Sequence, residues 1–337
     1  TETRSAHEIA LGIEGIGGAL DAYTSREHTA CHARVLDEHL PVAIERNVIL
    51  EEIAGVEDAP EEQIFDLHAR SLWGEHPYGN PVLGTVQTVS GITRENLVAL
   101  WRAAYQPEVT LVAAAGNVQH DELLELVARY FPKRSARGVA PELSTPNGGS
   151  PGERRYARDS SQVHICMGAP TFSRSDPRRY GAILVSTALG GGMSSRLFQK
   201  VREELGLVYT IYSFQAFYAR GGMSGIYMAT RPEAADRAVD EVRAELGLLA
   251  RDSLRGDGLD QIKQQTKGQL LLSLESTSAR LHRLAGVALY NEPYLTLDQI
   301  CARIDAVDED EVAELCQKYY APDQQVIVRL GPAGGGA

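Results

Sequence analysis

Residues 311–332 read EVAELCQKYYAPDQQVIVRLGP, and this stretch repeats a segment from the first half of the chain. A shift of 215 positions aligns the two segments in their apolar residues, their Tyr-x-Pro step and their glycine: Leu97 with Val312, Leu100 with Leu315, Tyr105 with Tyr320, Pro107 with Pro322 and Gly116 with Gly331. Both segments predict a helix, a short loop and a strand in the same register. The repeat therefore predicts two domains of one α+β fold.

Length and composition agree with two soluble globular domains. The chain has 337 residues, of which 43% are hydrophobic and 23% charged, and its formal net charge is −12. The negative charge argues against nucleic acid and against an anionic membrane surface as partners. No apolar run reaches the roughly 20 residues that a membrane-spanning helix needs. We expect a soluble protein, and the sequence does not distinguish cytoplasm from periplasm.

The cysteines and the N-terminus give two further expectations. Four scattered cysteines without a CxxC pair indicate neither a disulfide framework nor a zinc knuckle. The chain starts at Thr1 with no methionine and no signal-like segment, which suggests the interior of a longer protein.

The order of the expected elements gives the domain boundaries. We predict an N-terminal domain over 1–131, a Pro/Gly/Ser-rich linker over 132–157 and a C-terminal domain over 158–337. The expected strands are 19–36 (with a bend), 109–118 (buried), 163–168, 209–217, 223–228 and the end of the tail; the main expected helices are 61–73, 93–105, 121–131 and 177–189, with long helices up to about residue 290.

Two acids lie on one apolar face of a predicted helix, IERNVILEEI at residues 44–53. Glu45 and Glu52 are seven residues apart, close to two turns, and share that face with Val48 and Ile49. Burying a carboxylate costs several kcal/mol unless it meets a cation, a donor or a metal. Two interpretations therefore remain: acids paired with Arg or Lys, or a metal ligand with a second acid behind it.

The segment HTACH at residues 28–32 resembles a metal motif only superficially. On a helix His28 and His32 would share a face, but the surrounding Tyr, Thr and Val residues predict a strand. On a strand the two residues are about 13 Å apart, too far to share one zinc ion. We therefore predict that this segment is not a metal site.

Several motifs together resemble the M16 zinc peptidases, the family of mitochondrial processing peptidase, pitrilysin and insulin-degrading enzyme. They are GGALDAYTSREHT (17–29), ERNVILEEI (45–53), HPYGNPVLG (76–84), GGGMSSRLFQKVREELGLVY (190–209) and LLSLEST (271–277). The resemblance covers nearly the whole chain in the right order. It implies two duplicated domains, each a mainly antiparallel sheet packed against helices.

The resemblance also implies roles for individual residues. Glu52 matches the third zinc ligand, and Glu45 matches the acid that supports the site from behind. Arg202 and Tyr209 match the pair that holds the substrate backbone, although a surface charge is the alternative for Arg202. The strand from Ala19 to Ser25, with Ala22 and Tyr23, matches the edge strand to which substrates add.

The family pattern is incomplete in this chain. The HxxEH segment, whose two histidines bind zinc and whose Glu is the general base, is absent, and a helix and loop are missing between residues 43 and 44. We therefore expect zinc in the complete protein, no zinc in the chain as given, and no peptide hydrolysis by it.

Two explanations for the missing segments remain. The sequence is either a partial form of an M16 zinc metalloendopeptidase that cleaves peptides or unfolded segments, or a catalytically inactive subunit or peptide-binding scaffold. The expected partners are peptides and a second M16-type chain, in a homodimer or heterodimer. A purely structural assembly subunit is a third possibility, and it would not need Arg202 and Tyr209.

Overall fold

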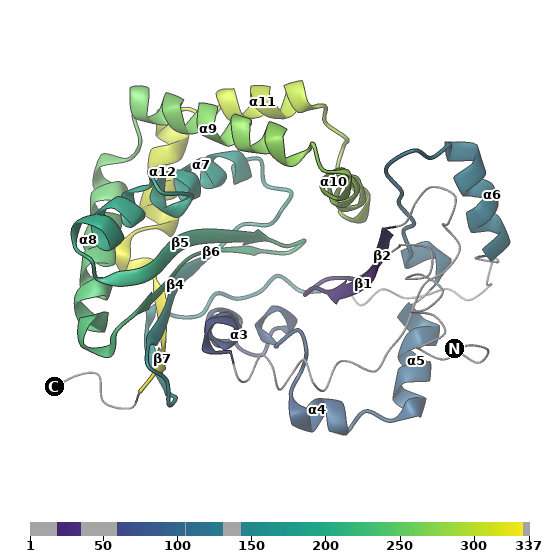
Figure 1. Cartoon of the computed structure of the whole chain (residues 1–337), viewed down its shortest axis with the longest axis horizontal. Helices are drawn as coiled ribbons and strands as arrows, with labels where there is room; N and C mark the ends of the chain where they lie inside the picture. The colour runs from purple at the N-terminus through teal and green to yellow at the C-terminus, as the bar shows by residue number, and fades with distance from the viewer. Residues whose placement is uncertain (1–18, 35–58, 105, 131–142, 333–337) are drawn as a thin grey trace. The chain divides into compact units, whose positions relative to one another are not determined.

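The computed structural model describes residues 19–34, 59–104, 106–130 and 143–332 (Figure 1). The chain divides into two compact units. Unit 1 comprises residues 1–54, 82–143 and 273–294, and unit 2 comprises residues 55–81, 144–272 and 295–337. Each unit thus combines segments from both halves of the sequence, whereas the sequence predicts contiguous halves.

Unit 2 is built on a five-stranded sheet with the order β3-β7-β4-β6-β5. The pair β3–β7 is parallel and the other pairs are antiparallel. Its strands are β3 (Gly152–Ala157), β4 (Val163–Thr171), β5 (Val208–Phe217), β6 (Gly222–Thr230) and β7 (Val326–Gly331). Its helical segments are α3 (Pro60–Trp73), η2 (Pro77–Gly79), α7 (Arg179–Gly190), η4 (Phe198–Glu204), η5 (Pro232–Ala234), α8 (Ala235–Asp252), α9 (Asp257–Ser273), α11 (Leu297–Asp305), α12 (Glu309–Tyr319) and η6 (Pro322–Gln324). This mainly antiparallel sheet packed against helices confirms the predicted α+β class.

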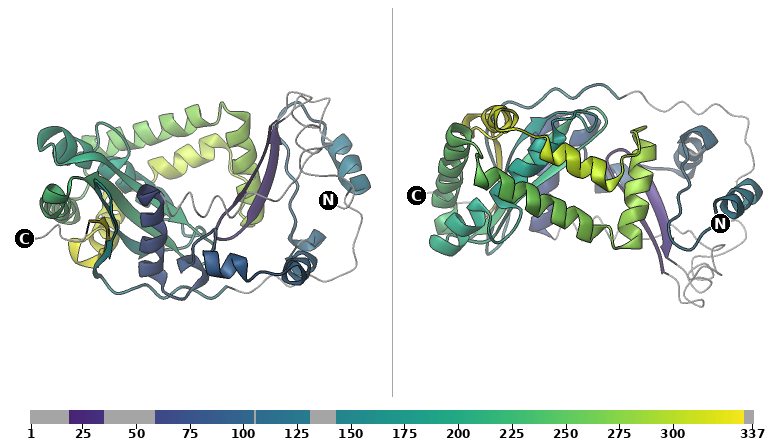
Figure 2. Two further views of the ribbon diagram at one scale, coloured as in Figure 1. Left: turned by 60° about the horizontal axis from the view of Figure 1, so that its bottom comes forward. Right: turned by 90° about the horizontal axis from the view of Figure 1, so that it is seen from above.

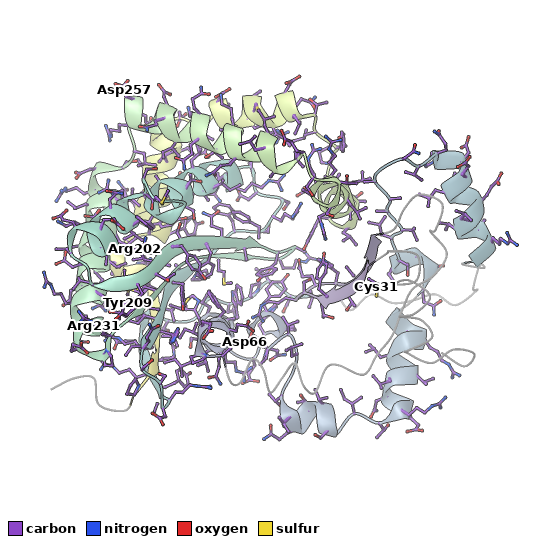
Figure 3. All side chains as sticks on the ribbon, in the orientation of Figure 1. Cys31, Asp66, Arg202, Tyr209, Arg231 and Asp257 are labelled. Carbon is purple, nitrogen blue, oxygen red and sulfur yellow. The ribbon has the colours of Figure 1, made fainter. Side chains whose placement is uncertain are left out.

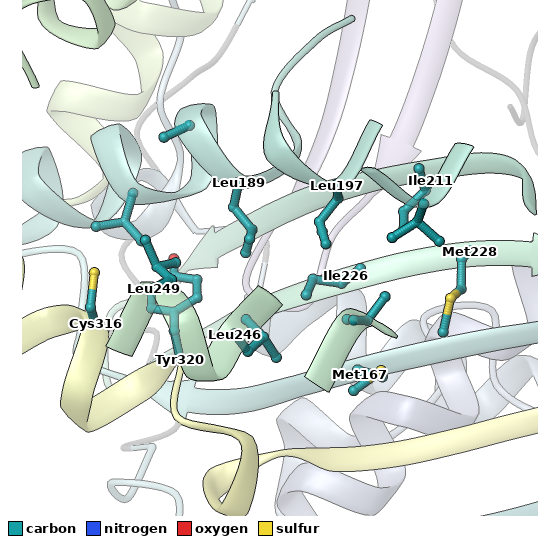
Figure 4. Close-up of a cluster of buried hydrophobic side chains, with 14 of the residues drawn as sticks. Met167, Leu189, Leu197, Ile211, Ile226, Met228, Leu246, Leu249, Cys316 and Tyr320 are labelled. Atoms are coloured by element: carbon teal, nitrogen blue, oxygen red, sulfur yellow. The ribbon is translucent and has the colours of Figure 1, made fainter. Parts of the chain in front are cut away.

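Both faces of this sheet are covered, because successive side chains of a strand point to opposite faces. On β4, Ile165 and Met167 join the larger core with α7, α8 and α12, while Cys166 between them joins the smaller core with α3. β6 alternates in the same way. Figures 1 and 2 show α3 on one face and α8 and α12 on the other, and Figure 4 shows the larger core.

Unit 1 contains a β-hairpin and several helices. Its elements are β1 (Ala19–Thr24), β2 (Thr29–Arg34), α4 (Val86–Ser90), α5 (Arg94–Ala104), η3 (Pro107–Val109), α6 (His120–Tyr130) and α10 (Thr277–Leu289). The single bent strand expected from the sequence is an antiparallel hairpin, with Ala22 opposite Cys31. Ser25 closes its turn, because the hydroxyl of Ser25 accepts hydrogen bonds from the backbone N–H groups of Glu27 and His28.

The structure reproduces the sequence repeat at the predicted offset. Helix α5 at 94–104 and helix α12 at 309–319 are 215 residues apart at both ends, as are η3 at 107–109 and η6 at 322–324. Thr93 and Asp308 occupy equivalent positions, and their side chains accept hydrogen bonds from the backbone N–H groups of Asn96 and Glu311. Sequence and structure thus agree on the duplicated helix and loop.

The two units exchange equivalent helices. The same offset carries α3 to residues 275–288, which nearly coincide with α10 at 277–289. Yet α3, from the first half, belongs to unit 2, and α10, from the second half, belongs to unit 1. In unit 2, Ile64 of α3 is fully buried in the smaller core. The exchange explains why the units do not follow the sequence halves.

Two further expectations differ from the structure. Residues 109–118 do not form the predicted buried strand, and Leu111 and Val112 are each 40% exposed. The equivalent strand β7 is stabilised by hydrogen bonds to β3 and β4, whereas nothing in the described part of unit 1 pairs with residues 110–116. Residues 152–157, predicted as the end of the linker, form β3, because they pair with β7.

Candidate substrate-binding site

Segment η4 carries one member of the predicted substrate pair and is anchored in the core of unit 2. Leu197 and Val201 are fully buried, and Figure 4 shows Leu197 among the core side chains. Phe198 and Arg202, each one residue further on, are only partly buried. The segment is π-helical: the N–H of Leu205 donates to the carbonyl of Lys200, five residues back, at 3.1 Å. Such wide turns are rare and often occur at functional sites.

A tight turn links η4 to β5. Gly206 has φ +59°, in the left-handed region that favours glycine, and the N–H of Leu207 donates to the carbonyl of Val201 at 3.0 Å. The pairing of β5 with β6 then shifts register between Val208 and Thr210, so Tyr209 is a bulged residue without a cross-strand partner. Bulges redirect side chains, and Tyr209 is 54% exposed.

The turn and the bulge bring Arg202 to the backbone of Tyr209. Nε of Arg202 donates to the main-chain oxygen of Tyr209 at 3.0 Å. The guanidinium carbon lies 4.5 Å from the centre of the Phe198 ring, and Nη1 lies 3.4 Å from a carboxylate oxygen of Glu203. Figure 3 shows Arg202 and Tyr209 at the same end of the sheet. We call Arg202 and Tyr209 the arginine clamp.

The glycine-rich loop before η4 has a defined backbone. A Cβ on Gly190 would lie 2.3 Å from the backbone nitrogen of Ser213 on β5, so only glycine fits there. Ser195 donates to the carbonyl of Gly192 through both its N–H and its hydroxyl, and the amide of Gln199 donates to the carbonyl of Met193 at 2.6 Å. These bonds hold the loop while the Met193 side chain stays 75% exposed.

The arginine clamp has the chemistry to hold an extended peptide backbone. The Arg202 side chain is 40% exposed, and Nη2 has no hydrogen-bond partner among the described residues. Guanidinium N–H groups and a phenol O–H are donors, and a peptide carbonyl is the matching acceptor. The structure therefore brings the Arg202 side chain to the backbone of Tyr209, the two residues to which the family resemblance gives a substrate-binding role.

The other predicted substrate residues, Ala22 and Tyr23, belong to unit 1. Strand β1 pairs only with β2 in the described part of that unit, so its second edge has no strand beside it there. The ring of Tyr23 lies 6.0 Å from that of His282 on α10, and the hydroxyl of Tyr290 donates to Glu27 at 2.6 Å. The hairpin is thus held by α10, the exchanged helix, and the role of β1 as a substrate strand stays a prediction.

The predicted metal ligand Glu52 and its supporting acid Glu45 lie outside the described residues. Within residues 19–34, 59–104, 106–130 and 143–332, no three His, Cys, Asp or Glu side chains form a group that could hold a metal ion. This part of the chain therefore does not fit a catalytic zinc ion, and we assign no step through a metal to it. His28 lies in the hairpin turn, where its Nδ1 is 3.0 Å from the hydroxyl of Ser25.

The motif HPYGNPVLG has a structural role. Tyr78 is fully buried, and its ring packs against Trp73 of α3 and Tyr218 after β5. Its hydroxyl accepts a hydrogen bond from the N–H of Arg220 at 3.2 Å. The motif therefore fixes the end of α3 to the hairpin that joins β5 and β6.

The duplicated α+β fold, the exchanged helices and the arginine clamp together define a class of protein. Comparison with known families shows which class this is. Residues 91–266 match the family described as "Peptidase M16 inactive domain", and residues 1–47 match "Insulinase (Peptidase family M16)". The first match alone covers more than half of the 337 residues. The chain belongs to peptidase family M16.

Relatives and solved structures agree with this assignment. A Streptomyces coelicolor protein described as an uncharacterized zinc protease is 36% identical over 98% of this chain and 78% of its own length. A Mycobacterium bovis protein with the same description is 37% identical over 99% of this chain and 81% of its length. The crystal structure of a peptidase M16 inactive domain from Pseudomonas fluorescens superposes with a TM-score of 0.83 at 20% identity, covering 99% of this chain and 85% of that one.

Sequence reasoning missed Phe198, whose ring lies beside the Arg202 guanidinium, and Ser195 and Gln199, which bond to carbonyls of the glycine-rich loop. A partial signal exists for Phe198, because it precedes Arg202 by four residues, a spacing at which helical side chains meet.

No helix in the described ranges is long and apolar enough to cross a bilayer.

Proposed function

We propose that the complete protein is an M16-type zinc metalloendopeptidase that cleaves peptides or unfolded segments. In this proposal unit 2 binds the substrate, and the arginine clamp holds a backbone carbonyl close to the bond that is cut. The observation that carries the proposal is the bond from Nε of Arg202 to the Tyr209 carbonyl, because it leaves donors of the same guanidinium for a substrate. Family membership and the zinc-protease names of the relatives support it.

The lengths of the alignments support a missing internal segment. The alignment with the Mycobacterium bovis relative extends over 362 positions, whereas this chain has 337 residues, so at least 25 of those positions have no residue of this chain. This is the behaviour expected if the sequence lacks a segment, as predicted near residues 43 and 44. We therefore propose zinc binding and catalysis for a form that carries the HxxEH segment, with Glu52 as the third ligand and Glu45 behind it.

A second candidate is a catalytically inactive M16 subunit or peptide-binding scaffold that pairs with an active chain. The observation that favours it is the match of residues 91–266 to a domain described as inactive. Such a subunit would use the same clamp to bind peptides. In either case we propose a homodimer or a heterodimer with another M16-type chain.

The first experiment measures the intact mass and the zinc content of the protein from its native source. A mass well above that of the 337-residue chain, with one zinc per chain, supports the endopeptidase. A mass equal to this sequence with no zinc contradicts the endopeptidase and supports the inactive subunit.

Two substitutions in the full-length protein test the site residues. Glu52→Gln should lower zinc content and activity together, and unchanged values of both would refute the metal assignment. Arg202→Ala should abolish peptide cleavage while zinc is retained, and normal cleavage would refute the clamp.

A further inference from the structure

We propose that Phe198 is a positioning residue for the arginine clamp: its ring sets the plane of the Arg202 guanidinium so that Nη1 and Nη2 face the peptide substrate. This inference rests on the proposed function of the clamp. It adds a residue for which neither the motifs nor the comparisons give a role.

Two contacts restrict the guanidinium in different ways. The bond from Nε to the Tyr209 carbonyl, at 3.0 Å, fixes one edge of the planar group. The Phe198 ring, 4.5 Å from the guanidinium carbon, is in reach of a cation–π contact with its face. The hydrogen bond at Nε and the ring contact at the guanidinium carbon hold the group at two points, whereas either contact alone leaves it more freedom to move.

Phe198 is itself held firmly enough to act in this way. Its neighbour Leu197 is fully buried, and Val201 one turn later is fully buried too. The side chain of Glu203, the other neighbour of the guanidinium, is 53% exposed and approaches only to 3.4 Å. A solvated carboxylate on a flexible stem orients a guanidinium less well than a half-buried ring does.

If Phe198 orients the Arg202 guanidinium in advance, the protein should bind peptide substrates more tightly. An arginine that is already fixed loses less side-chain freedom when it binds a carbonyl than a mobile one does. Removing the ring but keeping the volume should therefore weaken the clamp by about two- to fivefold, the range expected for an exposed cation–π contact.

The experiment compares Phe198→Leu, Phe198→Tyr, Arg202→Ala and the double variant Phe198→Leu/Arg202→Ala in the full-length, zinc-loaded protein. Peptide hydrolysis gives kcat and KM, and fluorescence anisotropy of a labelled unstructured peptide gives Kd for the chelator-treated protein. The matched control is Phe172→Leu, which removes an aromatic ring from another arginine, since Arg178 lies 5.1 Å from the Phe172 ring. Thermal melting of each variant reports on folding.

We expect Phe198→Leu to raise Kd and lower kcat/KM about two- to fivefold, Phe198→Tyr to behave like the parent, and Phe172→Leu to leave both constants unchanged. In the Arg202→Ala background, Phe198→Leu should cause no further loss. If Arg202→Ala impairs binding but Phe198→Leu does not, or if the two losses multiply, Phe198 does not act through Arg202 and this inference fails alone. If Arg202→Ala changes nothing, the proposed clamp function fails, and this inference fails with it.

Discussion

Nε of Arg202 donates a hydrogen bond to the main-chain oxygen of Tyr209, across seven residues of sequence, at 3.0 Å. The bond exists because the left-handed turn at Gly206 reverses the chain and the bulge at Tyr209 interrupts the ladder with β6. It ties the orientation of the arginine to the backbone of the strand that carries the tyrosine. The Arg202 side chain is thus preorganised on the backbone of Tyr209.

Tyr209→Phe in the full-length protein should lower kcat/KM roughly three- to tenfold, the loss expected for one hydrogen bond to substrate. Its stability should hardly change, because Tyr209 is 54% exposed and Arg202 bonds to its backbone rather than to its side chain. Steady-state kinetics and thermal melting check both points. The control is Tyr212→Phe on the same strand, 36% exposed; an equal loss in this variant would contradict a specific role for Tyr209.

Gly206→Ala should lower the free energy of unfolding by about 1–2 kcal/mol, because alanine is strained at φ +59° even though no atom lies within 4 Å of its Cβ position. Urea denaturation measures the change. Gly268→Ala is the matched control: Gly268 lies inside α9 with equally open surroundings, so alanine there should raise the stability by about 0.5–1 kcal/mol. Effects of the same sign in the two variants would show that backbone strain at Gly206 is not the cause.

Gly190→Ala and Gly192→Ala should differ sharply although the residues are two positions apart. A Cβ on Gly190 would collide with the backbone of Ser213 at 2.3 Å, which should cost about 1–3 kcal/mol of stability and disturb β5. A Cβ on Gly192 would approach only the amide of Gln265, at 3.8 Å, which is ordinary contact. Urea denaturation of the two variants side by side is the measurement. If the Gly192 variant is as unstable as the Gly190 variant, the collision with Ser213 is not the cause of the loss.

His68 should make the stability of unit 2 depend on pH. Burial lowers the pKa of His68 from 6.5 to about 4. Its Nε2 lies 3.3 Å from the carbonyl of Val326, and its Nδ1 has no hydrogen-bond partner among the residues that the structure describes. Between pH 6.5 and 4 the unfolded chain binds a proton that the folded chain does not. The stabilisation is therefore complete above pH 6.5 and is lost as the pH falls, by roughly 2 kcal/mol at pH 5.

The measurement is the free energy of unfolding at pH 7 and pH 5 for the parent and for His68→Gln. Glutamine retains a donor for the Val326 carbonyl but does not titrate. The variant should show a smaller decrease between the two pH values. An equal decrease in both proteins would mean that His68 is not responsible.

The repeat was predictable from the sequence because helix and loop signals are local. Apolar spacing, the Tyr-x-Pro step and the caps at Thr93 and Asp308 depend on neighbouring residues alone, and the structure places both copies 215 residues apart. The strand predicted over residues 109–118 does not form, because strand formation depends on distant residues. A strand is stable only when another strand pairs with it, and no strand in the described part of unit 1 pairs with these residues.

The site was predictable only in part. The resemblance singled out Arg202 and Tyr209, but their contact depends on a bulge and on a main-chain oxygen, which no side-chain pattern reports. The loop bonds of Ser195 and Gln199 to backbone carbonyls have the same character. The roles of Glu45 and Glu52 stay predictions, because these residues lie outside the described ranges.

The sequence by itself determined the α+β class, the duplication and the family, since each depends on patterns read along the chain. Only the tertiary structure decided that α3 joins unit 2 and α10 joins unit 1. An amphipathic helix specifies which of its faces is buried, but not which sheet buries it. That choice depends on contacts between residues far apart in sequence, such as His68 with Val326 and Tyr78 with Arg220.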